Sequence, residues 1–585
     1  MLIRQISLQW ISLGLAGVAL VLSTGGWACS NADTSFQGTG QIEAESHALL
    51  DDFDDPEADP PPRAGAPDPR LSGWPGGPEE AGQREGSGAP LSPDLLPFDV
   101  RNFGAQCDGV HSDGPAINRA IQAAGKSENR TVYIPAGTCY VRQEPGQATR
   151  DVPIRPEVNG LILSGEPGGA SRILLDADSP AILVSKGNTS PPEEVKDLTL
   201  QDLTIEVING RGVSNTAVVQ LNHATNLHVA DIAVKSNGLA HHARGILMSG
   251  VATSQGSTGL IERVVVDGGS KPGIYVASGT HHLTVKDCET MNMGSSASLG
   301  PPAVGMSISD AHSIRVIDHQ SHHNGGDGLL IATNGLPPIR LPGLPDDAYG
   351  SYYPLGQDHG PATTVEVNGG RFVNNGGQGG SGIKVASLFA EVPRDIRITG
   401  AIVQDNRSYG VLVEAGDSIV LEGAVISDNG IHGVLVRDVV LDGQAPEVSR
   451  TSRVQVIDPH IYDNGLGVST DIGGVEVWGR ARHVSLLAGI IEKRGASSRQ
   501  NVGIGLVKDG GRSCLDLLVE DIDVASAPMP YGWRSSEGVF NPVAVPSGRL
   551  FNCDGQTEET SSRLPITGAV PLSRAPATGA HGPDR

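Results

Sequence analysis

Five side chains suited to acid–base chemistry recur at matching places in a repeated phrase of the sequence. The phrase is a glycine, an apolar residue, any residue and a second apolar residue, and it occurs at nine glycines from Gly245 to Gly503. The five candidates near these glycines are Asp327, Lys384, Tyr409, His432 and Arg437. Carboxylate, imidazole and phenol groups move protons, while lysine and arginine stabilise developing negative charge. Their types predict a proton-transfer site.

The position of each candidate in the phrase predicts where it points. Asp327, Tyr409 and His432 directly precede a repeat glycine, and Lys384 follows one by two places. Residues alternate between the two faces of a strand, so the strand position of Lys384 points outward, and that of Arg437 does too. If successive repeats stack in register, all five side chains lie on one face. The alternative is a solvated face, since outward positions of a repeat protein are polar by default.

Substrate-binding residues are expected on the same face and in one insertion. The outward positions of the repeated phrase also carry Tyr275, Glu414, Glu476 and Trp478. The stretch Asn334–Ala362 interrupts the repeat and contains three tyrosines, which are Tyr349, Tyr352 and Tyr353. Loops that interrupt a rigid scaffold commonly bind ligands, and aromatic rings offer flat apolar faces. A loop without function is the alternative reading of this insertion.

The repeat itself predicts an all-β solenoid. Its glycines are 23 to 54 residues apart, and a second alternating strand recurs in phase with them. This period and pattern are typical of a parallel β-helix. The longest gap, Gly328 to Gly382, corresponds either to two coils or to one coil with an insertion. An asparagine between the two strands predicts a hydrogen-bonded ladder of amides through Asn292, Asn324, Asn375, Asn406, Asn429 and Asn464.

A short helix is expected at the start of the solenoid. Asp113 is a suitable N-cap, and Pro115 suits the first turn. Ile117 and Ile121 share one helical face, and Gly125 ends the pattern. Such a helix would cover the open end of the stack, which otherwise exposes a sheet edge.

The segment Phe98–Val141, "FDVRNFGAQCDGVHSDGPAINRAIQAAGKSENRTVYIPAGTCYV", resembles the opening of the pectate-lyase-like superfamily, in its rhamnogalacturonase/epimerase-like form. The resemblance implies a right-handed parallel β-helix solenoid from residue 98 to 553, with the short N-terminal capping helix. Members of this superfamily usually act on polysaccharides, so the resemblance also implies a glycan substrate. Because fold does not fix function, the chemistry has to come from the site residues.

Shorter phrases resemble two enzyme families of this fold. "HNGGDGLL" (His323–Leu330) is similar to a phrase of mannuronan epimerases that carries a catalytic aspartate, which maps onto Asp327. "DPH" at Asp458–His460 resembles their catalytic triplet, but it occupies a turn position shared with Asp318. "GIHG" (Gly430–Gly433) and "GIK" (Gly382–Lys384) resemble polygalacturonase motifs in reversed order and without the paired aspartates. Two-carboxylate hydrolysis is therefore less supported than proton abstraction.

The N-terminal sequence predicts export from a bacterial cell. Arg4 and the apolar stretch from Trp10 to Leu22 are typical of a signal peptide, residues 1–28, and are short for a membrane span. "GWAC" resembles a lipobox, which makes Cys29 a lipidation site; cleavage after Ala28 is the alternative. The location would be periplasmic, outer-membrane-anchored or extracellular.

Residues 29–97 predict a disordered linker, because they contain many prolines and hold 14 acidic residues against three arginines. Residues 554–585 form a similar tail.

Cysteines and charge complete the expectations. Cys107 with Cys139 and Cys514 with Cys553 would form disulfides at the two ends of the folded region. Cys288 would then be a buried thiol.

A net charge of −24 argues against a nucleic-acid partner. Neither a metal nor another cofactor is required by these motifs, although the groove carboxylates leave Ca²⁺ open. A monomer or small homo-oligomer is expected.

The sequence thus predicts an exported polysaccharide-active β-helix, a lyase or epimerase acting on a uronate-containing, acidic glycan. Two alternatives stay open at this point. One is a glycoside hydrolase of the pectinase type, and the other is a non-catalytic glycan-binding surface protein.

Overall fold

The computed structural model describes the chain from Phe98 to Phe551, apart from several internal segments. Those gaps are residues 145–151, 178, 185–193, 210–216, 237–243, 251–256, 278, 295–302, 334–360, 378–379, 388–390, 439–449, 508–514, 525, 535–539 and 543–549. All described residues belong to one compact unit, Ser87–Arg585. The predicted signal peptide, linker, Cys29 and C-terminal tail therefore lie outside the described residues. Among the described residues, no helix has the length and apolar character needed to cross a bilayer.

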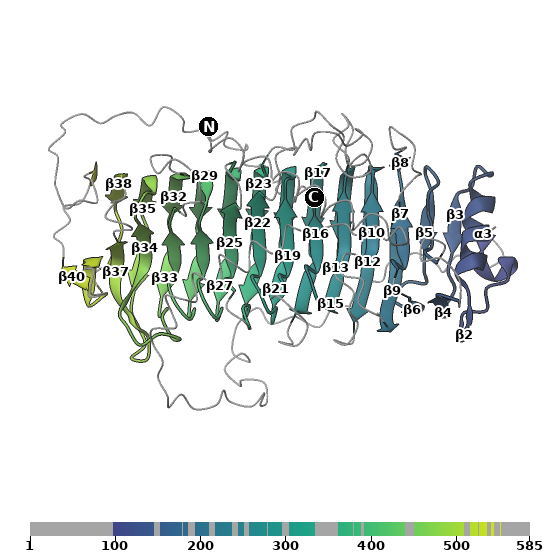
Figure 1. The fold of residues 1–585 in the computed structure, drawn as a ribbon, viewed down its shortest axis with the longest axis horizontal. Helices are drawn as coiled ribbons and strands as arrows, with labels where there is room; N and C mark the ends of the chain where they lie inside the picture. Colours follow the sequence, from purple (N-terminus) through teal and green to yellow (C-terminus); the bar gives the residue numbers. More distant parts are fainter. Residues whose placement is uncertain are drawn as a thin grey trace, which may run out of the picture. The chain divides into compact units, whose positions relative to one another are not determined.

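The described strands stack coil upon coil, as Figure 1 shows. All but two of them, which form a small separate sheet, lie in three rows. One row is a separate sheet of thirteen strands, called here the site sheet. A second sheet of 26 strands contains the other two rows. The two rows belong to one sheet because β9 and β12 each pair with strands of both rows. All pairings between successive coils are parallel until the C-terminal end, where β40 and β41 pair antiparallel. The predicted parallel β-helix is confirmed.

The site sheet consists of β7 (Ile182–Val184), β10 (Ala217–Asn222), β13 (Arg244–Ser249), β16 (Ile274–Val276), β19 (Met306–Ser309), β22 (Leu329–Thr333), β25 (Ile383–Ser387), β28 (Val411–Val413), β31 (Val434–Val436), β34 (Ile472–Trp478), β37 (Gln500–Val507), β39 (Met529–Arg534) and β40 (Phe540–Pro542). The row of longer strands consists of β14 (Ser257–Glu262), β17 (Thr280–Lys286), β20 (His312–Ile317), β23 (Thr363–Asn368), β26 (Arg394–Thr399), β29 (Gly416–Glu422), β32 (Thr451–Ile457), β35 (Arg482–Leu487), β38 (Leu515–Glu520) and β41 (Leu550–Phe551).

The row of shorter strands consists of β15 (Val265–Gly269), β18 (Glu289–Met293), β21 (Gln320–His322), β24 (Arg371–Val373), β27 (Ile402–Gln404), β30 (Val425–Ser427), β33 (His460–Tyr462) and β36 (Ile490–Glu492). The first coils contain β1 (Phe98–Asp99), the 3-10 helix η3 (Val100–Phe103), β2 (Asp108–Ser112), α3 (Gly114–Ala124), β3 (Thr131–Tyr133), β4 (Gly137–Arg142), β5 (Ile162–Ser164), β6 (Ser171–Asp176), β8 (Val195–Lys196), β9 (Thr199–Asn209), β11 (Ala224–Thr225) and β12 (Leu227–Ser236).

The predicted capping helix is α3, which lies at the purple, N-terminal end of the stack (Figure 1). Its apolar face is buried, including Ile117 and Ile121, and Gly125 follows its last residue. Asp113 occupies the predicted N-cap position, but its side chain makes no capping hydrogen bond. The carboxylate instead accepts hydrogen bonds from the backbone N–H groups of Gln106, Cys107 and Tyr140. It thereby connects β4 and the residues before β2 to the start of the helix.

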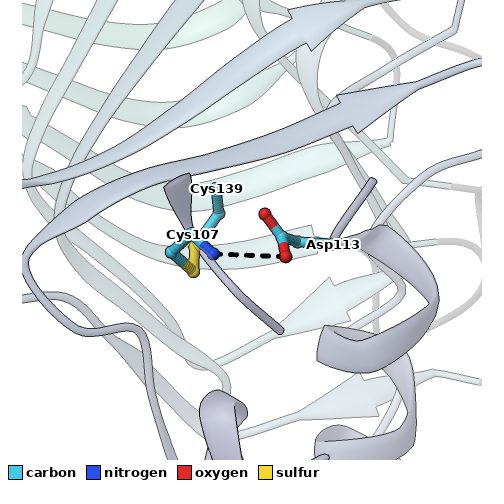
Figure 2. A group of neighbouring side chains, drawn as sticks. All are labelled: Cys107, Asp113 and Cys139. Carbon is cyan, nitrogen blue, oxygen red and sulfur yellow. Dashed lines mark hydrogen bonds between the residues drawn. A yellow bond between two sulfur atoms is a disulfide. The ribbon is translucent and has the colours of Figure 1, made fainter. Parts of the chain in front are cut away.

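The predicted Cys107–Cys139 disulfide is present beside Asp113, as Figure 2 shows. Cys288 is a free thiol, is buried as expected, and burial raises the pKa of its thiol to about 12. Cys514 and Cys553 lie outside the described residues, so the second disulfide stays a prediction.

The repeat glycine lies where coils pack most closely. At Gly382 an added Cβ would come within 2.7 Å of the Asn406 side-chain amide, and at Gly433 it would come within 2.9 Å of that of Asn464. Side chains further along each strand alternate, and the inward residues of every row are buried in one continuous apolar core. Glycine recurs because an added Cβ would overlap atoms of neighbouring strands and coils, among them the asparagine amides beside Gly382 and Gly433.

The asparagine column forms the predicted hydrogen-bonded ladder, with one correction. The side-chain amide of each asparagine from Asn324 to Asn429 donates to the Oδ1 of the next, over 2.8–3.1 Å, and Asn464 donates to Gln500 Oε1 at 2.8 Å. Asn292 is not part of this ladder. Its exposed amide donates to Asp267, and the backbone N–H of Met293 donates to Asn324 Oδ1 in its place.

Removing one amide from the middle of the ladder should destabilise the fold. In Asn406→Ala, the backbone and side-chain N–H groups of Asn375 and the Oδ1 of Asn429 each lose a buried partner. Unsatisfied buried polar groups cost about 1–3 kcal/mol each, so a loss of roughly 3 kcal/mol in unfolding free energy is expected. Urea denaturation measures it, with Asn292→Ala as the exposed control. Equal stability of the two variants would contradict the ladder.

The long gap between two repeats is one coil with an insertion. β22 pairs directly with β25, Leu330 opposite Lys384. The intervening chain therefore contributes no additional strand to the site sheet between them. The three tyrosines Tyr349, Tyr352 and Tyr353 belong to this insertion and lie outside the described residues.

A histidine buried inside the β-helix predicts that the fold loses stability in acid. Burial lowers the pKa of His319 to about 4, and its Nε2 lies 3.1 Å from the Thr290 hydroxyl. The unfolded chain binds a proton near pH 6.5 and the folded chain only near pH 4, so stability falls as pH decreases through this window. The contribution is on the order of 3 kcal/mol. Thermal melting of His319→Leu across this pH range should show a shallower slope; an unchanged slope would contradict the assignment.

Candidate functional site

Residues at three recurring places along the site sheet form three columns. The first column contains the residue before each repeat glycine, the second the residue two places after it, and the third the residue four places after it. Over five adjacent coils, the first column contains Asp327, Ser381, Tyr409, His432 and Gly473; the second contains Leu330, Lys384, Leu412, Leu435 and Glu476; and the third contains Ala332, Ala386, Glu414, Arg437 and Trp478.

Backbone pairing fixes the first two columns coil by coil. From Gly245 to Gly410, the N–H of each repeat glycine donates to the first-column carbonyl of the next coil, including those of Asp327, Tyr409 and His432. Strand register aligns Lys384 with Leu412, Leu412 with Leu435 and so on to Glu476. Asp327, Lys384, Tyr409, His432 and Arg437 therefore lie on one face of one sheet. Neighbouring strands are about 4.8 Å apart, so the five belong to one compact patch.

A buried ion cluster joins the second and third columns. Glu414 accepts from Lys384 Nζ at 3.0 Å, and its other carboxylate oxygen accepts from Arg437. Burial alone would raise the pKa of Glu414, but these two cations outweigh burial and lower it to about 2. Two positive charges thus face one carboxylate, which leaves an excess of positive charge on these three residues.

Asp327 lies beside this cluster but is held differently. Its side chain is buried, and Oδ1 accepts the backbone N–H of Ser381 at 2.6 Å. Burial raises the pKa of Asp327, and the nearby charge of Lys384 offsets only part of that effect. A carboxyl group with a raised pKa in an enclosed position is suited to hold or orient a proton.

Tyr409 and His432 form a stacked pair on adjacent coils. Their ring centroids are 5.7 Å apart with an interplanar angle of 12°. His432 is enclosed, with 3% of its side chain exposed, whereas Tyr409 is partly exposed. Burial lowers the pKa of His432 and raises that of Tyr409. Both directions favour the neutral forms, a proton acceptor beside a proton donor.

Glu476 stabilises the position of this pair from the next coil. Its carboxylate accepts the backbone N–H of Gly473 and the indole N–H of Trp478, each at 2.8 Å. Its Oε1 also lies 3.1 Å from His432 Nδ1, within ion-pair distance. That nitrogen is not aligned for a hydrogen bond with Glu476 or with any other part of the described chain. The contact is therefore electrostatic, and it opposes the lowering of the His432 pKa by burial.

Several charged residues at the site were missed by the sequence reasoning. Arg450 is buried, donates through Nη2 to the carbonyl of Ser387 at 2.8 Å, and donates its backbone N–H to the buried Asp438. Burial lowers the pKa of Arg450, while Asp438 and Glu414 oppose that effect. Arg450 begins the coil after Arg437 and carries no repeat signal, so only its packing reveals it. Arg534 is also close enough to lower the His432 pKa.

The predicted substrate-binding residues have different surroundings. Tyr275 is partly exposed on the site sheet, with the Arg244 guanidinium carbon 4.9 Å from its ring centroid. Trp478 is partly exposed but turns its N–H toward Glu476. Glu414 and Glu476 are buried, and protein groups bind their carboxylates, so positioning roles suit them better than direct contact with substrate.

One group of three potential metal ligands with atoms all within 4.8 Å of one another occurs among the described residues, and it is unsuited to a metal. Cys107, Asp113 and Cys139 bring a carboxylate and two sulfurs together (Figure 2). Both sulfurs are joined in the disulfide, and the Asp113 oxygens already accept three backbone N–H groups. The disulfide and the Asp113 carboxylate therefore have a structural role.

Residues 98–326 match the family described as rhamnogalacturonase A/epimerase, pectate lyase-like. A 111-residue stretch is 32% identical to mannuronan C5-epimerase AlgE1 of Azotobacter vinelandii, and this stretch is 19% of the chain and 8% of the epimerase. The chain therefore matches only a small part of the length of that epimerase.

Two solved structures show the same fold at low identity. The catalytic unit of the GH87 α-1,3-glucanase of Streptomyces thermodiastaticus aligns with a TM-score of 0.50 and 14% identity, over 76% of this chain and 71% of that one. The pre-mature gene product 12 of bacteriophage phi29 aligns with a TM-score of 0.51 and 14% identity, over 78% of this chain and 61% of that one. Residues 98–326 are thus similar to the pectate-lyase-like family, and the β-helix that they begin has the fold of these two solved structures.

Proposed function

We propose that the chain is an exported enzyme that removes the proton next to the carboxylate of a uronate-containing polysaccharide, leading to β-elimination or to epimerisation. The observation that carries the proposal is the stacked, neutral Tyr409–His432 pair beside the cation-rich cluster of Lys384, Glu414 and Arg437. The partial match to a mannuronan C5-epimerase supports a uronate substrate.

The cations would prepare the substrate for proton removal. A uronate C5–H is weakly acidic because the adjacent carboxylate is already negative. Lys384 and Arg437 each keep part of their side chains exposed, 17% and 14%, while Glu414 neutralises one of their two charges. The remaining positive charge would stabilise the carboxylate as it gains electrons from C5.

Proton transfer would then use the stacked pair. The neutral His432 imidazole accepts the C5 proton, and the Tyr409 hydroxyl donates a proton to the product. Because His432 is almost enclosed, the substrate has to lie directly against the pair. Asp327 and Glu476 would act as positioning residues, the first beside Lys384 and the second behind His432.

The position of the donor decides which product forms. Tyr409 and His432 belong to neighbouring coils of one sheet, so both approach a flat sugar from the same side. This arrangement suits elimination, with Tyr409 protonating the departing C4 oxygen. Epimerisation needs a proton delivered to the opposite side of C5, from a group above the sheet.

Product analysis tests the proposal and separates its alternatives. The full chain is incubated with a panel of acidic polysaccharides, with and without a chelator for Ca²⁺. Elimination gives an unsaturated product that absorbs in the ultraviolet, and epimerisation changes the C5 signals in NMR spectra. New reducing ends without ultraviolet absorbance would instead identify a glycoside hydrolase, and binding without any product would identify a glycan-binding protein.

A further inference from the structure

Three histidines lie together on the row of longer strands, which is not part of the site sheet. His281 and His282 belong to β17, and strand register places His312 of β20 opposite His281 on the next coil. The Nδ1 atoms of His281 and His282 are 2.7 Å apart. The rings of His281 and His312 stack with centroids 5.0 Å apart, and the ring of His282 meets both edge-on. These three residues are called here the imidazole cluster.

A bulge at the start of β17 explains why two consecutive side chains face outward. Neighbouring residues of a strand normally point to opposite faces. The register between β14 and β17 shifts here, so that His281 and His282 stand against the single residue Thr258, and His282 has a φ of 49°. Neither histidine is buried, whereas the next residue, Leu283, returns to the core. Bulges of this kind re-aim side chains and are frequent next to functional sites.

The imidazole cluster lacks the carboxylate partner that other histidines have. In the part of the chain that the structure describes, five histidines outside the site sheet lie within ion-pair distance of a carboxylate, namely His111, His228, His322, His460 and His483. No described carboxylate pairs with His281, His282 or His312. Burial and the neighbouring rings lower the pKa of His281 and of His312. The cluster therefore presents neutral imidazoles, the form whose lone pair binds a metal ion.

The separation of the two Nδ1 atoms suits a shared cation. Two imidazole nitrogens 2.7 Å apart need a positive group between them, because their lone pairs repel each other. A proton on one ring supplies it as a hydrogen bond, and a metal ion supplies it through two bonds. Imidazole is a preferred ligand of Zn²⁺, Cu²⁺ and Ni²⁺, with Zn–N bonds of about 2.0–2.1 Å. Tetrahedral bonds of that length separate two nitrogens by about 3.3 Å, so the exposed His282 ring has to move only slightly.

We propose that His281, His282 and His312 form a binding site for a divalent transition-metal ion, with a water molecule as the fourth ligand. His281 and His282 bind it through Nδ1. The exposed His312 ring turns about its own side-chain bonds to bring a nitrogen to the ion from the next coil. The ion thereby links two successive coils and stabilises the stack. Ca²⁺ is a poor occupant, because it prefers oxygen ligands. The site is independent of the proposed function.

Isothermal titration of the full chain with ZnCl₂ at neutral pH tests the site. His282→Ala and His312→Ala should each weaken the binding of one equivalent of Zn²⁺ more than tenfold, since loss of even an outer-shell partner costs a metal site about 10–100-fold in affinity. Both side chains are exposed, and circular dichroism would show that the variants are folded. Zn²⁺ should also raise the melting temperature of the unaltered chain, because the unfolded chain does not hold the ligands together.

His483→Ala is the matched control. His483 occupies the same place in its coil as His282, with a φ of 52°, but Asp516 lies 3.2 Å from its Nδ1. This variant should bind Zn²⁺ as the unaltered chain does. Acidification below about pH 5 should release the ion, because a protonated imidazole has no lone pair for it.

Other outcomes overturn the proposal. The site does not exist if the unaltered chain binds no Zn²⁺, or if His282→Ala binds it with unchanged affinity. Full affinity in His312→Ala would reject the three-ligand site and leave a chelate of two adjacent histidines. An equal loss in His483→Ala would show scattered binding by surface histidines. Displacement of Zn²⁺ by an equal concentration of Ca²⁺, or binding that survives acidification, would show that oxygen ligands hold the ion.

Discussion

Replacing His432 by alanine should lower turnover of the uronate polymer by about 10³-fold, since general-base catalysis typically contributes 10²–10⁴-fold. The imidazole is neutral because burial lowers its pKa, and it lies against Tyr409, so its loss removes the proton acceptor. Initial rates on the polymer measure the effect. Circular dichroism and thermal melting would show that the variant is folded.

A matched control lies on another row of the same molecule. His460 also has a carboxylate partner, with its Nε2 2.9 Å from Glu492, but it belongs to the row of shorter strands. His460→Ala should therefore keep full activity. Glu476→Gln should preserve part of the activity. It should also move the acidic limb of the pH–rate profile to lower pH, because Glu476 raises the His432 pKa. Full activity of folded His432→Ala would reject the site.

Replacing Glu414 by alanine should cost about 3–5 kcal/mol of folding stability, the range for breaking a buried ion pair. Lys384 and Arg437 would lose their shared partner in a position where each is mostly enclosed. Urea denaturation measures the change. Glu366→Ala, which breaks an exposed pair with Arg315, should cost less than about 1 kcal/mol.

Glu414 should also contribute to the loss of folding stability at low pH. The folded pKa of Glu414 is about 2, below the ordinary value of 4.5, so its ionised form stabilises the fold above pH 4.5. That contribution is lost as pH falls from 4.5 toward 2, and Glu414→Ala should lack it. Replacing the cluster together, by Lys384→Met, Glu414→Leu and Arg437→Met, should restore most of the stability. A single variant as stable as the unaltered chain would show that the cluster contributes nothing.

The alignment of the coils could be predicted because it follows from local chemistry. Gly382 and Gly433 have no room for a side chain beside the amide column, and the coils from Gly245 to Gly503 repeat a glycine at this place. Once that place is known, the outward positions of Lys384 and Glu476 follow from strand alternation. The recurring place directly before the glycine likewise put Asp327, Tyr409 and His432 at matching positions of their coils.

Details that depend on packing could not be predicted. Asn292 and Met293 are adjacent in "MNM", and only the backbone geometry, with Asn292 at φ 59°, shows which one takes the ladder position. Arg450 has no repeat signal, and its contact with Ser387 joins segments 63 residues apart. The partner of Glu414 was equally hidden, since three cations lie within reach of that column.

The central claim is that this face removes the C5 proton of a uronate, and exchange with solvent tests it most directly. The full chain is incubated with a mannuronan-type polymer in D₂O, and the fate of the C5 hydrogen is followed by NMR. The account predicts that C5–H is lost, either with formation of an unsaturated sugar or with entry of deuterium at C5, and that His432→Ala abolishes this loss. A polymer that is cleaved while every C5 retains its original hydrogen would contradict the account.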